Sequence, residues 1–182
     1  MPVPSNNEER GAIALKFKLD TNFVWVVNTH LGLDDDFQVE QIEEIKNRYL
    51  TFDEVVPVLI TGDFNIEDIN NHGENVNITS EDVVHYGNTI QSLLDSGIKK
   101  LEFNDTESRK YSFHSWNSVS NGRTIDYIFW LDRLNRPSPK ISTLRPGPYN
   151  STTINSVCPE YKSSNRYFSD HNGLMIKHKL FE

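Results

Sequence analysis

Apolar residues recur along the chain in short runs and in alternating stretches, which is typical of β-strands. Residues 12–19 alternate loosely and residues 23–27 form an apolar run, so the turn-forming residues 20–22 between them predict a hairpin. Residues 55–60 predict a buried strand. Asn121-Gly122 is a strong hairpin signal between two further strand-like segments. The two segments that flank this signal are residues 111–116 and 124–130, and a last strand is predicted over residues 173–181.

Two other segments show the spacing of helices. Asp34, Asp35 and Asp36 follow Gly32 and mark a helix start, because negative charge suits the amino-terminal end. A second helix is predicted to begin near Thr79 or Ser80 and to end at Gly97. The apolar positions that define the two stripes are Val39, Ile42, Ile45 and Tyr49 in the first helix and Val83, Ile90, Leu93 and Leu94 in the second.

The order of these elements predicts one α/β domain of mixed layers over residues 1–182. Residues 66–77 are rich in Asn and Gly and predict an exposed loop. Residues 134–165 are rich in Pro, Ser, Thr and Asn and form either a long loop or an insertion.

Composition excludes several classes of protein. Apolar residues make up 36% of the chain and aromatic residues 11%, so the composition is not that of a disordered protein. No apolar stretch approaches the roughly 18 residues of a membrane span. The polar first ten residues predict no signal peptide and favour the cytoplasm or nucleus. Cys158 is the only cysteine, so no internal disulfide is expected, and no Cys/His cluster has zinc spacing.

The formal net charge of −8 bears on possible partners. Proteins that bind nucleic acid mainly through phosphate contacts usually carry a basic face, whereas Lys and Arg are scattered here. The acidic balance argues against tight, non-specific DNA binding. It does not exclude a nuclease, because a metal ion can supply local positive charge.

Four polar clusters lie at the ends of apolar strands or within them. Taken singly, each has an ordinary structural explanation: a satisfied histidine, a turn cap, an outward-facing strand residue or a loop dipeptide. Together, three Asp, one Asn and two His at one end of a sheet would form a metal-assisted hydrolytic centre. No Gly-x-Ser-x-Gly motif or phosphate-cradling glycine loop points to another chemistry. The clusters are His30, Gly62-Asp63-Phe64-Asn65, Asp126 and Asp170-His171.

In this order, the four clusters resemble the endonuclease/exonuclease/phosphatase superfamily. This group includes pancreatic-type deoxyribonucleases, abasic-site endonucleases, neutral sphingomyelinases and inositol polyphosphate 5-phosphatases. The segments that carry the resemblance are Asn28-Thr29-His30-Leu31, Gly62-Asp63-Phe64-Asn65, Arg123-Thr124-Ile125-Asp126 and Ser169-Asp170-His171, together with a helix bearing Gln41. The resemblance implies a metal-dependent phosphoesterase that hydrolyses phosphodiester bonds by in-line attack of an activated water.

The resemblance also implies roles for individual residues. Asp63 and Asn65 would hold the phosphate and the attacking water, with Asp63 as proton acceptor or metal partner. His30 would stabilise charge on the phosphoryl group or protonate the leaving oxygen. His171 would contact the scissile phosphate, and Asp126 would hold its ring.

The implied cofactor is a divalent ion, Mg²⁺ or alternatively Mn²⁺. Asp170 would be its ligand, together with Asp63. The implied partner is a phosphodiester substrate, either nucleic acid or a lipid or inositol phosphate.

The implied fold is a four-layer α/β/β/α sandwich, of which this chain resembles mainly the second, carboxyl-terminal half. The family's first half supplies an Asn and a metal-binding Glu, and Glu8 and Glu9 lie too close to the strand that begins near Arg10 to replace that Glu. The inner face of the sheet is therefore expected to expose apolar surface. The alternatives to a nuclease-like enzyme are a sphingomyelinase-like or inositol-phosphate phosphatase-like hydrolase, or a non-catalytic remnant that serves as a binding module.

Overall fold

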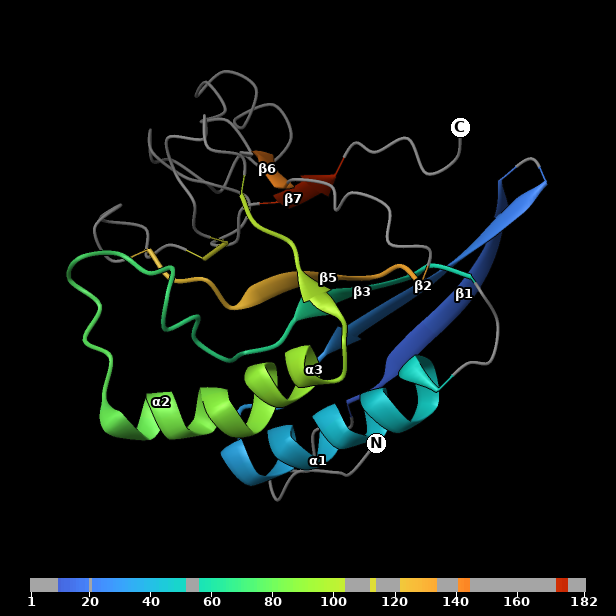
Figure 1. Cartoon of the computed structure of the whole chain (residues 1–182). Helices are drawn as coiled ribbons and strands as arrows, with labels where there is room; N and C mark the ends of the chain where they lie inside the picture. Colours follow the sequence, from blue (N-terminus) through green and yellow to red (C-terminus); the bar gives the residue numbers. More distant parts are fainter. Residues whose placement is uncertain are drawn as a thin grey trace, which may run out of the picture.

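A mixed β-sheet with helices on one face forms the body of the molecule (Figure 1). The computed structural model describes residues 10–19, 21–51, 56–103, 112–113, 122–133, 141–144 and 173–176. The predicted mixed α/β class is confirmed.

The sheet has five strands in the order β1-β2-β3-β5-β4. β1 and β2 form the predicted antiparallel hairpin, β3 is parallel to β2, and β5 is antiparallel to both β3 and β4. The carboxyl ends of β2 and β3 therefore lie beside the beginning of β5. The strands are β1 (Ala12–Leu19), β2 (Asn22–His30), β3 (Val58–Asp63), β4 (Lys99–Lys100) and β5 (Asp126–Leu131).

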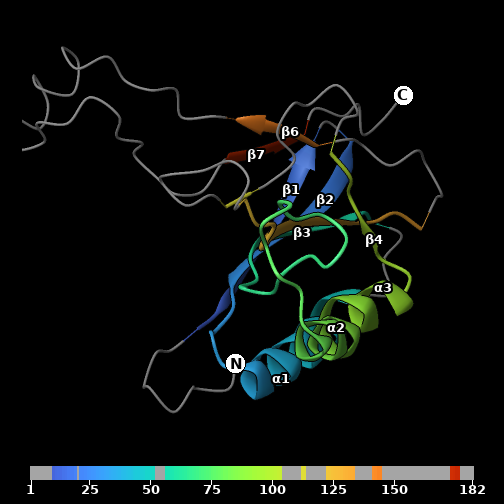
Figure 2. The ribbon, with the colours of Figure 1, turned by 90° about the vertical axis from the view of Figure 1, so that its left-hand side faces the viewer.

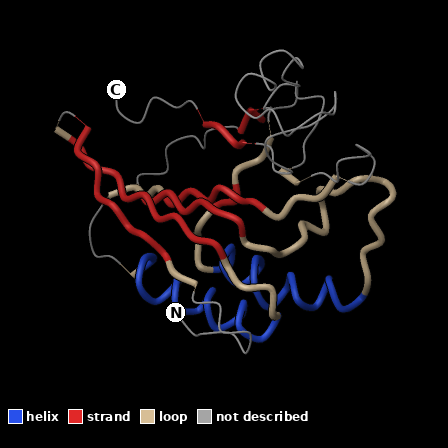
Figure 3. Tube along the Cα trace, turned by 180° about the vertical axis from the view of Figure 1, so that it is seen from behind, coloured by secondary structure: helices blue, strands red, loops and turns tan. Residues whose placement is uncertain are grey.

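Three α-helices lie together on one face of the sheet (Figure 3). Asp34 caps the first helix by accepting the N–H of Phe37, which confirms the predicted start. Thr79 caps the second through a reciprocal pair of bonds with Asp82, and these bonds lower the pKa of Asp82. Gly97 ends the helical segment with φ of +89°. The helices are α1 (Asp35–Ile45), α2 (Ser80–Tyr86) and α3 (Ser92–Asp95).

The buried faces of the helices differ from the predicted stripes. In α1 the buried set includes Gln38 and Gln41, while Val39 is only half-buried. In α2, Val83 was predicted to be buried and is 48% exposed, whereas Tyr86 is buried. Five residues in π-helical geometry, Gly87–Gln91, join α2 to α3. This wider turn shifts the helical phase, so one stripe with a period of 3.6 residues cannot describe the whole segment.

The main core lies between the helices and the sheet. Phe64, from the Gly-Asp-Phe-Asn motif, is fully buried there. Its ring meets those of Tyr127 and Phe129 edge to face, with centroid distances of 5.5 and 5.2 Å. Burying such a ring contributes about 2 kcal/mol, so Phe64 anchors the residues on either side of it in the motif.

A two-stranded sheet covers part of the opposite face (Figure 2). It consists of β6 (Ile141–Leu144) and β7 (Gly173–Ile176). Ile141 and Leu174 from these strands pack with Ile128 and Trp130 of β5. The described residues thus form three layers, and the predicted four-layer sandwich is confirmed only in part.

The face away from the helices is open along β1. Ile13, Leu15 and Phe17 are 67%, 53% and 45% exposed, while Ala12 and Ala14 of the same strand pack against the main core. This alternation places the three large side chains on the side of the sheet where β6 and β7 lie. The expectation of an exposed apolar surface therefore agrees with the structure.

Several predicted boundaries were wrong. The strand predicted at 55–60 begins at Val58 and continues to Asp63, because it pairs with β2 and β5 along this whole length. The predicted strand at 124–130 begins at Asp126, and Phe113 pairs with Arg123 in a single antiparallel bridge.

Two predictions about loops also need correction. Within the predicted exposed loop 66–77, the structure buries Ile66, Glu67 and Asp68. β6 lies inside segment 134–165, and the rest of that segment is outside the described residues, as are positions 177–181 of the last predicted strand.

Candidate active site

Three of the predicted site residues lie in one row across the sheet. In the strand register, His30 at the end of β2 pairs with Asp63 at the end of β3, and Asp63 pairs with Asp126 at the start of β5. Residues at paired positions direct their side chains to the same face of a sheet. That face is the one away from the helices. The fold therefore brings together residues separated by 33 and 63 positions in the sequence.

Contacts on both sides of His30 fix the tautomer of its ring. The Arg10 guanidinium lies 3.1 Å from Nδ1 and can only donate, so Nδ1 accepts. The hydrogen of the neutral ring is then on Nε2, which lies 3.5 Å from Oδ2 of Asp63. The His30 side chain is 53% exposed. An N–H group thus faces the Asp63 carboxylate at an accessible position.

The turn after β3 holds Asp63 and Asn65 together. Oδ1 of Asp63 accepts the backbone N–H of Asn65 at 2.9 Å. Asn65 has φ of +53°, a left-handed conformation that Asn tolerates better than most residues. Its Nδ2 donates to the carbonyl of Leu31 at 2.9 Å and so ties the turn to the end of β2. The amide has a second N–H hydrogen, and its Oδ1 is an acceptor.

Asp126 is half-buried and directly opposite Asp63. Its backbone N–H donates to Oγ of the fully buried Ser112, which also accepts the N–H of Ile125. Like charges at directly opposed positions of a sheet repel each other. A cation bound between the two carboxylates would offset this repulsion.

The site is only partly contained in the described residues. Asp170 and His171, the predicted metal ligand and phosphate contact, lie outside them. Asp63, Asn65 and Asp126 offer oxygen donors of the kind that Mg²⁺ prefers. Among the residues that the structure describes, however, no group of three His, Cys, Asp or Glu side chains is placed to hold a metal ion. These residues thus have suitable donor chemistry, but they do not form a complete metal site by themselves.

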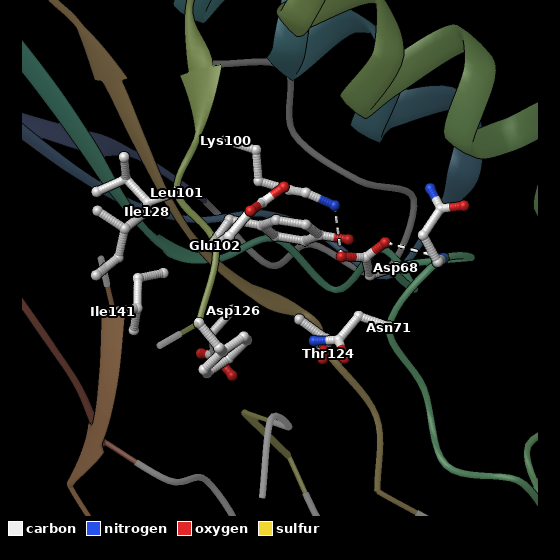
Figure 4. A pocket seen from close by; sticks show the side chains of 12 residues that line it. Asp68, Asn71, Lys100, Leu101, Glu102, Thr124, Asp126, Ile128 and Ile141 are labelled. Carbon is white, nitrogen blue, oxygen red and sulfur yellow. Dashed lines mark hydrogen bonds and ion pairs between the residues drawn. The ribbon is translucent and has the colours of Figure 1, made fainter. Parts of the chain in front are cut away.

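A pocket of about 230 Å³ opens beside Asp126 (Figure 4). One wall carries the ion pair between Lys100 and Asp68, and another is formed by apolar side chains that include Ile128 and Ile141. A group bound next to Asp126 would meet both polar and apolar surface.

The loop after β3 contains two buried acidic residues that the sequence analysis missed. Glu67 pairs with Arg123, and burial raises the pKa of Glu67 above its ordinary value even though Arg123 opposes this. Asp68 is 2% exposed and accepts a bond of 2.6 Å from Lys100. Isoleucines on both sides of the two acids, in Ile66-Glu67-Asp68-Ile69, are a sequence signal for their burial. The basic partners that make this burial possible are distant in sequence, so they could not be identified from it.

Replacing Lys100 with methionine is expected to lower the free energy of unfolding by about 3 kcal/mol, because Asp68 would remain as a buried charge without its cation. The double variant Asp68→Leu with Lys100→Met should recover most of this loss. Urea unfolding of both variants measures the effect. A single variant as stable as the wild type would show that the pair is unimportant.

The same pair predicts a pH dependence. Burial lowers the pKa of Lys100, but the charge and hydrogen bond of Asp68 outweigh it and raise this pKa above the ordinary value of 10.5. The stabilisation is therefore complete below pH 10.5 and is lost as the pH rises through the raised value.

Comparison with solved structures shows which fold the chain has, whereas comparison with known sequences finds no relative. No protein-family model and no curated protein sequence matches the chain. Several solved structures do match. Beta toxin from Staphylococcus aureus aligns with a TM-score of 0.60 at 19% identity, over 96% of this chain and 59% of that one. A beta toxin mutant with bound magnesium ions aligns over the same shares with a TM-score of 0.58 at 19% identity.

Two further structures support the same fold. D. rerio TDP2 complexed with a single-strand DNA product aligns with a TM-score of 0.57 at 15% identity, over 92% of this chain and 60% of that one. The endonuclease/exonuclease/phosphatase from Bacteroides vulgatus aligns with a TM-score of 0.52 at 19% identity, over 92% and 56%. The chain thus spans a little over half the length of these proteins. None of the described helices has the combination of length and hydropathy that a bilayer-spanning segment requires.

Proposed function

We propose that this chain, which has the fold of the endonuclease/exonuclease/phosphatase superfamily, carries the site of a metal-dependent phosphodiesterase. The main support for the proposal is that His30, Asp63 and Asp126 occupy paired positions on three neighbouring strands. Side chains at paired strand positions share one face of the sheet, so the row places one histidine and two carboxylates together. The sequence resemblance predicts phosphodiester hydrolysis from these same residues.

The three residues of the row, and Asn65 beside them, each have a chemical role in this proposal. Asp63 accepts a proton from the attacking water, and Asn65 orients this water through its amide. His30, with its hydrogen on Nε2, donates to a phosphoryl oxygen or to the leaving oxygen. Asp126 orients the ring of His171, as the resemblance implies. The roles of Asp63, Asn65 and His30 are supported by the donors and acceptors of their side chains.

The proposed cofactor is Mg²⁺, with Mn²⁺ as an alternative, held by Asp63 and Asp170. The suitable oxygen donors and the magnesium ions bound by a beta toxin mutant support this choice. When bound, such an ion offsets the negative charge that develops on the phosphoryl oxygens.

Nucleic acid is the first substrate class to test, since a TDP2 structure contains a single-strand DNA product. A lipid or inositol phosphodiester is the second class. The pocket beside Asp126, with one polar and one apolar wall, is a candidate site for the part of the substrate that flanks the phosphate.

The test is hydrolysis of plasmid DNA, a sphingomyelin analogue and inositol phosphates by the chain, in Mg²⁺, Mn²⁺ or EDTA. Hydrolysis of at least one substrate is expected with metal and not with EDTA. The Asp63→Ala variant, prepared in parallel, controls for contaminating nucleases and should be inactive. If wild type and variant behave alike on every substrate, the proposal is wrong for this chain, and a binding module becomes the better interpretation.

A further inference from the structure

Gln38 links both segments that leave the sheet at the candidate site. It lies on α1 and is 1% exposed. Its Nε2 donates to the carbonyl of Gly32, after β2, at 2.6 Å and to the carbonyl of Asn65, after β3, at 3.3 Å. Gln41, one helical turn further on, accepts the N–H of Gly32 at 3.0 Å. Two buried glutamines thus hold the backbone on which the site is built.

The hydrogen-bond pattern determines how the Gln38 amide is oriented. Backbone carbonyl oxygens surround one of its two terminal atoms, so this atom must be the NH₂ group. The other atom, Oε1, then lies 2.6 Å from Nε2 of His85 on α2. Because an amide oxygen only accepts, His85 must carry its hydrogen on Nε2. Both the neutral tautomer with this hydrogen and the imidazolium ion can donate there.

The turn that Gln38 supports is conformationally unusual. Asn65 adopts a left-handed backbone conformation, and its N–H donates to Oδ1 of Asp63. Such conformations persist where surrounding contacts hold them. The carbonyl of the same residue accepts from Nε2 of Gln38, so Asn65 is held through both its N–H and its C=O. Loss of this contact would therefore free the turn to relax.

We propose that Gln38, oriented by His85, is a positioning residue that holds the Asn65 turn in the geometry needed beside Asp63. The catalytic part of this inference rests on the proposed phosphodiesterase function. The structural part, that the contact holds the turn, can be tested without any activity. His85 acts through Gln38 and touches no predicted catalytic group in the described contacts.

Hydrogen exchange of the Asn65 backbone amide tests the structural part. Gln38→Leu removes the donors and leaves buried carbonyls unbonded, so exchange at Asn65 should become about tenfold faster. Amides of the β1–β2 hairpin should exchange as in the wild type. His85→Leu should show the same local effect, while His85→Gln, which can still donate to Oε1 of Gln38, should restore slow exchange. Gln91→Leu, at an exposed glutamine between α2 and α3, is the matched control.

Kinetics test the catalytic part on the best substrate of the proposed assay. We expect kcat of Gln38→Leu to fall about tenfold with KM within about twofold, because Asn65 orients the attacking water in the proposed mechanism, whereas the pocket beside Asp126 is left unchanged. His85→Gln should keep the wild-type kcat. Unchanged exchange at Asn65 would overturn the whole proposal, and faster exchange with unchanged kcat would overturn its catalytic part.

The two proposals fail in different ways. If the wild-type chain hydrolyses no phosphodiester, the proposed function fails, and exchange alone then decides whether Gln38 holds the turn. If the wild type is active and the Gln38 and His85 variants match it in both readouts, only the positioning role is wrong.

Discussion

Replacing Gly62 with alanine is expected to destabilise the protein by about 4 kcal/mol, an exceptional effect for one methyl group. A Cβ at this position would lie 1.9 Å from the carbonyl oxygen of Thr29 and 2.8 Å from its carbonyl carbon. Both are backbone atoms of β2, so no side chain can move aside to relieve the contact. Gly62 also has φ of +148°, which side chains of L-residues rarely adopt. The parallel pairing of β2 with β3 would have to open, and the His30–Asp63 pair lies one residue further along it.

Gly87→Ala is the matched control for this substitution. Gly87 lies in the π-helical turn with φ of −59°, and a Cβ there meets no atom within 4 Å. Alanine should therefore stabilise the protein by up to about 1 kcal/mol. Urea unfolding monitored by circular dichroism measures both variants. An unfolding midpoint for Gly62→Ala equal to that of the wild type would contradict the close approach of the two strands.

Much of the fold follows from local patterns in the sequence. The 12–30 hairpin and the capped starts of both helical segments depend on neighbouring residues, and the structure agrees with each. The strand predicted at 55–60 exists, but it runs from Val58 to Asp63 and includes Asp63 itself. The π-helical turn Gly87–Gln91 could not be predicted, since it shifts the phase of the apolar stripe without a marker in the residue types. The sequence also did not predict the buried contacts of Phe64, Glu67 and Asp68, because their partners come from strands and loops distant in sequence.

The candidate site was predicted residue by residue, but its geometry was not. The sequence places His30 and Asp63 at the ends of strands and Asp126 within one, yet only the register shows that they occupy paired positions. Gln38 and His85 were missed because polar residues in a helix normally face solvent. Their roles depend on the backbone carbonyls of Gly32 and Asn65, which no side-chain pattern reveals.

The substitutions Asp63→Asn and Asp126→Asn are each expected to reduce phosphodiester hydrolysis by about a thousandfold. Asn keeps the size of the side chain but cannot accept a proton or provide negative charge. The double variant should show no further fall, since residues that act as a unit are not additive. Both single variants should remain folded, because Asn keeps the size of the side chain and its Oδ1 at position 63 can still accept the N–H of Asn65.

The initial rate of hydrolysis of bis(para-nitrophenyl) phosphate, with saturating Mg²⁺ and again with EDTA, measures whether the row His30, Asp63 and Asp126 belongs to a metal-dependent phosphodiesterase site. Asp36→Asn, an exposed position in the first turn of α1, serves as the matched control. We expect magnesium-dependent hydrolysis by the wild type and by Asp36→Asn, and a loss of about a thousandfold in Asp63→Asn, in Asp126→Asn and in their combination. Equal rates in all of these proteins, or no magnesium-dependent hydrolysis by the wild type, would contradict this prediction.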